Sequence, residues 1–210
     1  MTVHGSFASE LLPGVLVVSE PSGIKDIKAD GVAGVVWQRH PLASFQNWID
    51  TLDPLVLSRA RIVLRPEAVR SAVAATCDKA GPPDGPERER LLDDIAALAE
   101  MFANVTGSRW LRLRLDIVAT NACRRFHVDR ISARLICTYR GTGTQYGTTE
   151  DGDPEVIHTV ATGAPFVMRG TLWKPSPDPG LVHRSPPIEG TGETRLMLVL
   201  DPVDDPDEDL

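Results

Sequence analysis

The pattern of apolar residues changes at Gly107, and this change restricts the folds that the chain can adopt. Before it, residues 42 to about 106 are helical in character, because segments such as PERERLLDDIAALAEMF repeat apolar residues at helical spacing. After it, residues 111–117 alternate leucine or isoleucine with charged side chains, which indicates a strand with one buried face. A helical half followed by short strands predicts an α+β fold, in which a barrel or sandwich is flanked by helices.

Further strand-like segments follow, separated by clusters of Gly, Pro and Asp: CRRFHVD, ARLICTYR, EVIHTV, PFVMRGTLWK, GLVHR and TRLMLVL. The polar segment 141–155 is expected to be a loop and a candidate lid. The length of 210 residues suits one compact unit. Within it we expect an N-terminal segment with supporting helices (1–106), a barrel core (107–201) and a disordered acidic tail (202–210).

The net charge of −7 is concentrated at the C-terminus. The last ten residues hold six acids and no base, which leaves a net charge of −1 for the rest of the chain. A nearly neutral body offers no broad cationic surface for phosphate backbones. General nucleic-acid binding is therefore not expected.

The cysteines and the N-terminal sequence bear on where the protein works. Cys77, Cys123 and Cys137 are scattered and form no CxxC pair, which favours neither a disulfide framework nor a thiolate zinc finger. The first twenty residues do not resemble an export signal, and no segment approaches the roughly 20 apolar residues of a membrane span. We expect a cytoplasmic protein that does not bind membranes.

The segment FHVD contains the residues with the clearest chemical meaning. Alternate side chains of a strand share a face, so His127 and Asp129 would project together. His183, in GLVHRSPP, is the best candidate for a third ligand. Two imidazoles and one carboxylate form the ligand set of non-haem Fe(II) oxygenases, which leaves further coordination positions open. The alternative is that HxD is a coincidence and His183 an ordinary surface histidine.

The flanking segments favour the metal site. FHVD, RLICTYRG, RGTLW, LVHRSPP and TRLMLVL resemble, in that order, the strands of Fe(II)- and 2-oxoglutarate-dependent dioxygenases over residues 108–201. The order resembles more closely a bacterial family known only as a domain of unknown function. The resemblance to the dioxygenases implies a double-stranded β-helix, Fe(II) held by His127, Asp129 and His183, 2-oxoglutarate as co-substrate, and hydroxylation of an unknown substrate.

The same resemblance suggests two residues that would bind 2-oxoglutarate. Arg195 on the last strand would pair with the far carboxylate, a task that suits the planar guanidinium. Tyr139 would donate to a carboxylate of the co-substrate. The alternatives are a surface charge for Arg195 and a core tyrosine for Tyr139, since the sequence does not tell which face of the strand 132–140 lines the pocket. The His183-to-Arg195 spacing is slightly long for the superfamily, and GTGT stands where a Gly-Gly pair is common.

Other functions fit the same residues. The three ligands could hold Zn(II) in a non-catalytic metal-binding or metal-homeostasis module, because nitrogen and oxygen ligands generally bind zinc more tightly than Fe(II). A cupin-like metal hydrolase or isomerase is a weaker alternative, since the usual HxH signature is absent. The helical half is compatible with a homodimer contact, and the sequence identifies no substrate.

Overall fold

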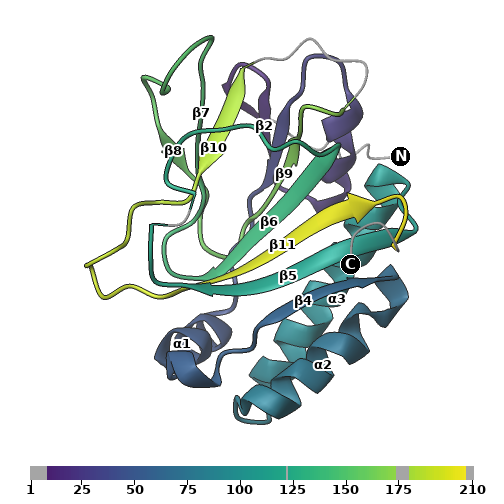
Figure 1. Ribbon diagram of the computed structural model, residues 1–210, viewed down its shortest axis with the longest axis vertical. Helices are drawn as coiled ribbons and strands as arrows, with labels where there is room; N and C mark the ends of the chain where they lie inside the picture. The colour runs from purple at the N-terminus through teal and green to yellow at the C-terminus, as the bar shows by residue number, and fades with distance from the viewer. Residues whose placement is uncertain (1–8, 122, 174–179, 207–210) are drawn as a thin grey trace, which may run out of the picture.

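The computed structural model describes residues 9–121, 123–173 and 180–206, which form two β-sheets and a group of helices (Figure 1). The large sheet has eight strands in the order β1 (Ser9–Leu12), β2 (Val15–Val18), β3 (Gly34–Trp37), β9 (Pro165–Arg169), β6 (Ala133–Arg140), β11 (Arg195–Val203), β5 (Trp110–Val118) and β4 (Ala60–Leu64). The small sheet has the order β10 (Leu181–Arg184), β7 (Gln145–Thr148) and β8 (His158–Thr159). Neighbouring strands are antiparallel except β2 and β3.

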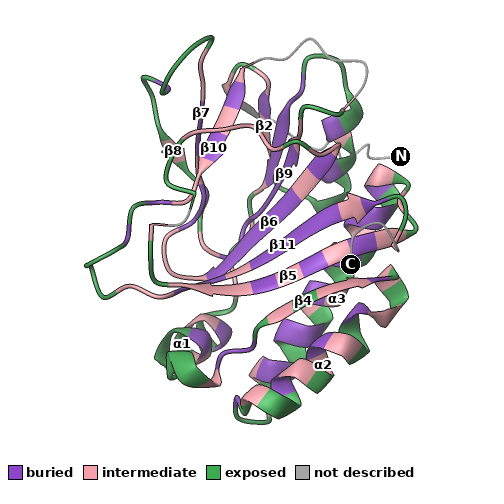
Figure 2. Cartoon of the chain, in the orientation of Figure 1, coloured by how far each residue is buried: buried purple, intermediate pink, exposed green. Residues whose placement is uncertain are grey.

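One face of the large sheet is covered by helices. The α-helices are α1 (Ala43–Thr51), α2 (Val69–Ala80) and α3 (Pro86–Thr106), and the 3₁₀ helices are η1 (Pro21–Lys28), η2 (Pro54–Val56) and η3 (Pro66–Ala68). Helix α3 packs on β5 and β11, whereas η1 covers β3 and β9. Figure 2 shows that α2 and α3 bury the sides that face the sheet and expose their outer sides. Their apolar residues therefore join the sheet in the main core.

Each of the two long helices ends at a glycine. Gly81 (φ 89°) and Gly107 (φ 72°) adopt the left-handed conformation, and their backbone N–H groups donate to the carbonyls of Cys77 and Ala103. Glycine adopts this conformation without the steric cost of a Cβ atom. Pro86 stands in the first turn of α3, where its missing N–H would have no helical partner. These residues explain why the expected helices form with sharp ends.

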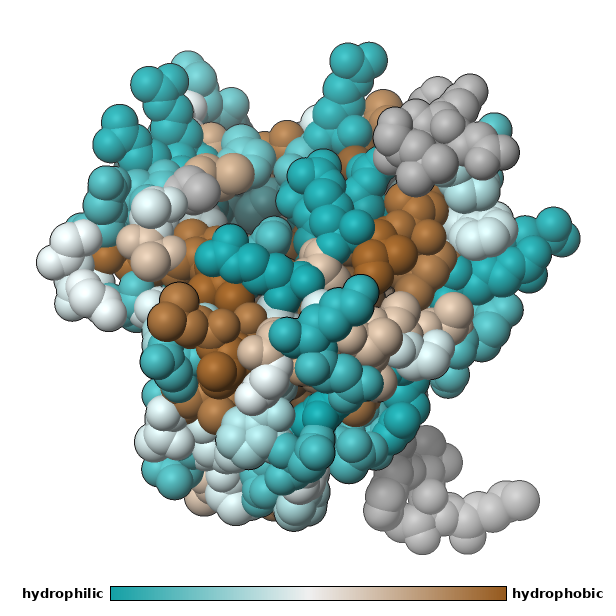
Figure 3. All heavy atoms as spheres, turned by 60° about the horizontal axis from the view of Figure 1, so that its bottom comes forward, coloured by the Kyte–Doolittle hydropathy of each residue, from teal (hydrophilic) through white to brown (hydrophobic). Residues whose placement is uncertain are grey.

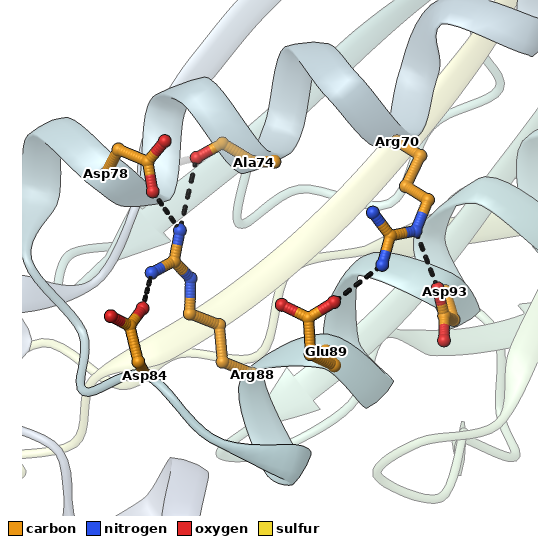
Figure 4. Close-up of polar contacts among 7 residues, drawn as sticks. All are labelled: Arg70, Ala74, Asp78, Asp84, Arg88, Glu89 and Asp93. Carbon is orange, nitrogen blue, oxygen red and sulfur yellow. Dashed lines mark hydrogen bonds and ion pairs between the residues drawn. The ribbon is translucent and has the colours of Figure 1, made fainter.

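Ion pairs fasten α2 to α3 on their outer side (Figure 4). Arg70 of α2 lies 2.6 Å from Glu89 and 2.7 Å from Asp93 of α3. Arg88 of α3 reaches back to Asp78 of α2 and also pairs with Asp84 in the connecting loop. The pairs of Arg70 are exposed to solvent and contribute little to stability, whereas those of Arg88 involve a side chain that is itself only 9% exposed. The helical hairpin therefore depends mainly on its buried face.

The alternation of β6 separates the two core layers. Leu135, Cys137 and Tyr139 point toward the helices, whereas Ile136 points to the opposite face. On that opposite face, Phe166 of the large sheet meets Tyr146 of β7, with ring centroids 4.8 Å apart. The two sheets thus face each other across an apolar layer. The face of β6 that carries Arg134, Ile136 and Thr138 is the one turned toward the small sheet.

The α+β class is confirmed, and residues 42–106 contain α1, α2 and α3 as their helical character suggested, but the division of the chain differs from the prediction. Residues before Gly107 supply β1, β2, β3 and β4, so they build half of the large sheet and do not only support it. The expected loop 141–155 contains β7, which pairs with β10. Strand β11 continues to Val203, into the expected tail, and residues 207–210 lie outside the described residues.

Two further expectations concern the whole molecule. Within the described residues the two sheets share no β-ladder, so the closed barrel expected from the sequence is not seen. Figure 3, which brings the helical end forward, shows separate apolar patches among hydrophilic side chains. None of the described helices has the length and apolar character needed to span a bilayer.

Candidate metal centre

Two histidines from distant segments are joined through their backbones. The N–H of His127 donates to the carbonyl of His183 at 3.0 Å, and the N–H of His183 donates to the carbonyl of His127 at 3.0 Å. His183 is part of β10, whereas His127 belongs to no strand and forms only this isolated bridge. The imidazole centroids lie 4.5 Å apart. The reciprocal pair of hydrogen bonds fixes the separation of the two side chains.

Asp129 completes a cluster with these histidines. Its Oδ2 lies 3.1 Å from Nε2 of His183, and its Oδ1 lies 3.7 Å from Nε2 of His127. One ligand atom from each residue lies within 4.8 Å of the other two. Two atoms bound at about 2.1 Å and at right angles to one metal are about 3 Å apart, so these separations suit a shared metal ion after small side-chain shifts. The three predicted ligands therefore come together.

The protonation states suit metal binding. Nδ1 of His127 lies 2.8 Å from the carbonyl oxygen of Arg125, which accepts its hydrogen and leaves the lone pair of Nε2 for a ligand. Burial lowers the pKa of His183, which keeps its imidazole neutral. Burial opposes ionisation of Asp129, but hydrogen bonds with His127 and His183 outweigh it and hold the pKa of this carboxyl well below its usual range. The cluster thus offers an ionised carboxylate and a neutral His183, the forms that bind a divalent cation.

The two oxygens of Asp129 differ in their partners. Oδ1 lies 2.6 Å from Nη1 of Arg134, whereas Oδ2 is buried, and its neighbour Nε2 of His183, at 3.1 Å, does not form a well-directed hydrogen bond with it. Leaving a buried acceptor unpaired is costly, and a metal ion would satisfy it. The side chain of His183 is only 8% exposed and that of His127 is 35% exposed, so solvent reaches the cluster on the His127 side.

Arg195 is a buried cation that forms no ion pair with a described residue, although Glu193 lies near enough to attract it. It is 0% exposed, and its guanidinium donates to the carbonyl of Thr142 at 2.6 Å, to Oγ of Ser185 at 3.3 Å and to Oγ1 of Thr138 at 3.4 Å. None of these partners carries a charge, and burial lowers the pKa of Arg195 to about 10. Ser185 lies two residues after His183, which connects this position to the metal ligands. The prediction of a surface charge is thereby excluded.

Comparison with known sequences identifies the family. A family described as "Protein of unknown function (DUF1826)" matches residues 18–201, which is most of the chain. The chain belongs to the DUF1826 family. No curated protein matches this DUF1826 chain.

Several solved structures are similar to the DUF1826 chain. The auxin-oxidation dioxygenase 1 of Arabidopsis thaliana, in complex with 2-oxoglutarate, has 11% identity and a TM-score of 0.55, with 95% of each chain covered. The corresponding rice dioxygenase has 11% identity and a TM-score of 0.49, covering 90% of this chain and 79% of that one. A prolyl-4-hydroxylase of Pseudomonas putida has 16% identity and a TM-score of 0.39, covering 80% and 97%. The likeness to the first confirms the resemblance to 2-oxoglutarate oxygenases at the level of the fold.

The structure corrects the expectation for Tyr139. The odd residues of β6 face the helices, so Tyr139 is buried there and its hydroxyl donates to Asp94 of α3 at 2.7 Å. Its ring also makes an edge contact with Phe45 of α1. Thr138 lies on the other face of β6 and contacts Arg195 instead. Tyr139 of the DUF1826 chain is therefore a core tyrosine, and the structure does not support it as a ligand of the co-substrate.

No role for Ser185 or Asp201 was inferred from the sequence, which also left open whether the face of strand 132–140 with Arg134 and Thr138 lines the pocket. Asp201 fell at the end of the expected barrel core, where a single acid after the apolar run LMLVL was a signal of a buried charge. Arg134 shares a strand face with Thr138, a pattern visible in the sequence, but only the structure shows which face is turned toward the metal ligands.

Proposed function

We propose that this protein is an Fe(II)- and 2-oxoglutarate-dependent oxygenase that hydroxylates a still unidentified substrate on a double-stranded β-helix fold. The observation that carries the proposal is the pairing of two features. Oδ2 of Asp129 is buried without a well-directed hydrogen bond and faces two imidazoles, and the nearby strand β11 bears a buried cation, Arg195, whose hydrogen-bond partners are neutral. The first suits a metal ion, and the second suits a carboxylate group of a small molecule.

Each residue would have a defined task. His127, Asp129 and His183 would hold Fe(II), and their three donors would leave positions for other ligands. Arg195 would pair with the far carboxylate of 2-oxoglutarate, and the hydroxyls of Thr138 and Ser185 would orient it. When bound, iron and co-substrate together would supply the oxidising power for C–H hydroxylation. The protein contributes ligand orientation, charge balance and shielding from water on the side of His183.

The zinc-binding alternative uses the same three ligands but assigns no role to Arg195. Burial of the Arg195 guanidinium is costly, its hydrogen-bond partners are neutral, and a purely metal-binding module would gain nothing from the charge. Zinc in the purified protein would not distinguish the two functions. Such ligands intrinsically bind zinc more tightly than Fe(II), so the metal found depends on which metal is available. The two functions are distinguished by whether a 2-oxo acid binds next to the metal.

The test is anaerobic reconstitution with Fe(II), followed by 2-oxoglutarate and then air. We expect a visible charge-transfer band on adding 2-oxoglutarate and succinate after exposure to air. His127→Ala should abolish stoichiometric metal binding, whereas Arg195→Met should retain the metal and lose the 2-oxoglutarate band. Arg61→Met on the exposed face of β4 is the matched control and should behave as the wild type. Absence of both the band and succinate in the wild type, with tight retention of zinc, would contradict the proposal.

A further inference from the structure

Arg134 connects the metal ligand Asp129 to a second buried carboxylate. Nη1 of Arg134 lies 2.6 Å from Oδ1 of Asp129. The other edge of the guanidinium binds Asp201, with Nε 2.6 Å from Oδ1 and Nη2 2.8 Å from Oδ2. Arg134 therefore uses both edges of its planar group, one for each acid. Such a two-point contact with Asp201 fixes the plane and direction of the guanidinium.

Asp201 belongs to the rigid part of the fold. It is 1% exposed, and it stands on β11 next to Leu200, which pairs with Leu135 of β6. Arg134 and Asp201 are thus cross-strand neighbours in the centre of the large sheet, on the face turned toward the small sheet. Arg114 of β5 also contacts Asp201, at 3.3 Å. Three adjacent strands therefore hold the guanidinium in place.

Asp129 has no comparable support from a strand. It precedes β6, and its backbone carbonyl accepts from the N–H of Thr171 at 2.9 Å. Rotation about the side-chain bonds of Asp129 would exchange its two oxygens. The contacts of the carboxylate with neighbouring side chains therefore decide which oxygen faces the histidines. Arg134 takes Oδ1 and leaves Oδ2 beside Nε2 of His183. The contact that selects one oxygen is therefore the contact with Arg134.

We propose that Arg134, anchored by Asp201, is a positioning residue that presents only Oδ2 of Asp129 to the metal. The inference rests on the metal site of the proposed function. A carboxylate that offers one oxygen occupies a single coordination position, which leaves the others for 2-oxoglutarate and oxygen. Asp201 also balances the charge of Arg134, which would otherwise compete with the metal ion for Asp129.

The test uses Co(II) as a spectroscopic probe in the full-length chain, with affinity and visible absorption measured together. Asp201→Asn keeps the shape of the side chain but removes the charge that balances Arg134, so we expect the affinity for Co(II) to fall about tenfold or more. Arg134→Leu frees Oδ1 of Asp129, so we expect an altered Co(II) spectrum because the number of bound oxygens changes. Arg134→Lys retains one charged donor and should keep a spectrum close to that of the wild type.

Asp94→Asn is the matched control. Asp94 binds Arg39 through two contacts of 2.6 and 2.7 Å, similar to those of Asp201, but on the helix-covered side of the sheet. This control should lower thermal stability and leave the affinity and spectrum of Co(II) unchanged. Unchanged affinity in Asp201→Asn together with an unchanged spectrum in Arg134→Leu would overturn the proposal. If Arg134→Leu does not fold, Asp201→Asn decides by itself: an affinity for Co(II) equal to that of the wild type would overturn the proposal. If His127→Ala binds Co(II) as well as the wild type does, the metal site itself is wrong.

Discussion

The residues of the metal cluster could be predicted from the sequence, but partly for a different reason than the structure gives. The spacing of His127 and Asp129 suggested one strand with both side chains on one face. In the structure His127 forms an isolated bridge to His183, and Asp129 lies outside any strand. Backbone pairing with β10 and the contact with Arg134 bring the ligands together instead. Long-range contacts of this kind leave no local signal in the sequence.

Arg195 allows a prediction about stability at the scale of a single side chain. Arg195→Met removes a buried charge but retains most of its volume, so we expect the free energy of unfolding of the metal-free protein to be unchanged or higher by about 1 to 2 kcal/mol. Thermal unfolding with and without 2-oxoglutarate is the measurement. The co-substrate should raise the melting temperature of the metal-loaded wild type and not that of the variant. A large loss of stability in the metal-free variant would show that Arg195 is mainly structural.

At the scale of elements, the sequence predicted the helices and strands that have a regular apolar period, but it did not predict how the strands pair or which face of each strand is turned inward. Helix α3 and strand β5 are long and have a clear period, so the sequence located both. Strand β7 is short, mostly polar and contains a glycine, and it forms because β10 and β8 pair with it on both sides. The orientation of β6 depends on its neighbours, which is why the sequence could not exclude Tyr139 from the site.

The connection after β9 gives a prediction at this scale. A Cβ atom at Gly170 would lie 2.2 Å from the carbonyl oxygen of Ile131 and 2.7 Å from that of Asp129. Gly170→Ala must therefore displace the segment that carries the metal ligand, and we expect the metal affinity to fall at least tenfold. Gly190→Ala is the control, since a Cβ there meets no atom within 4 Å and costs only the strain of φ 81°, about 1 kcal/mol. Isothermal titration with a divalent metal would measure both, and equal affinities would refute the expectation.

At the scale of the whole molecule, the large sheet joins the two halves of the chain. Strand β3 pairs with β9, and β4 pairs with β5. Strands from the N-terminal half therefore flank the four central strands at both of their edges. Buried residues of η1 and α3 belong to the same core as those of β6 and β11. The sequence suggested one compact unit in which the residues before Gly107 only support the barrel, whereas in the structure their strands are hydrogen-bonded into the large sheet and share its core.

A fragment provides the test at this scale. Residues 107–206 alone would leave β5 and β9 without one neighbour each and would expose the core face of the sheet. We expect this fragment to be unfolded and to bind no metal at stoichiometric amounts, whereas residues 9–206 should fold and bind. Circular dichroism and metal analysis are the measurements. A fragment that folds and binds metal would show that the N-terminal half is a separable support after all.

The reciprocal hydrogen bonds between His127 and His183 have a consequence for the order of events in the cell. Protein synthesis proceeds from the N-terminus, so His127 and Asp129 leave the ribosome before β10 does. Until β10 pairs with His127, these two residues are without their proposed third ligand and without the strand that aligns them. Binding of the proposed metal ion by all three residues therefore has to follow the synthesis and pairing of β10.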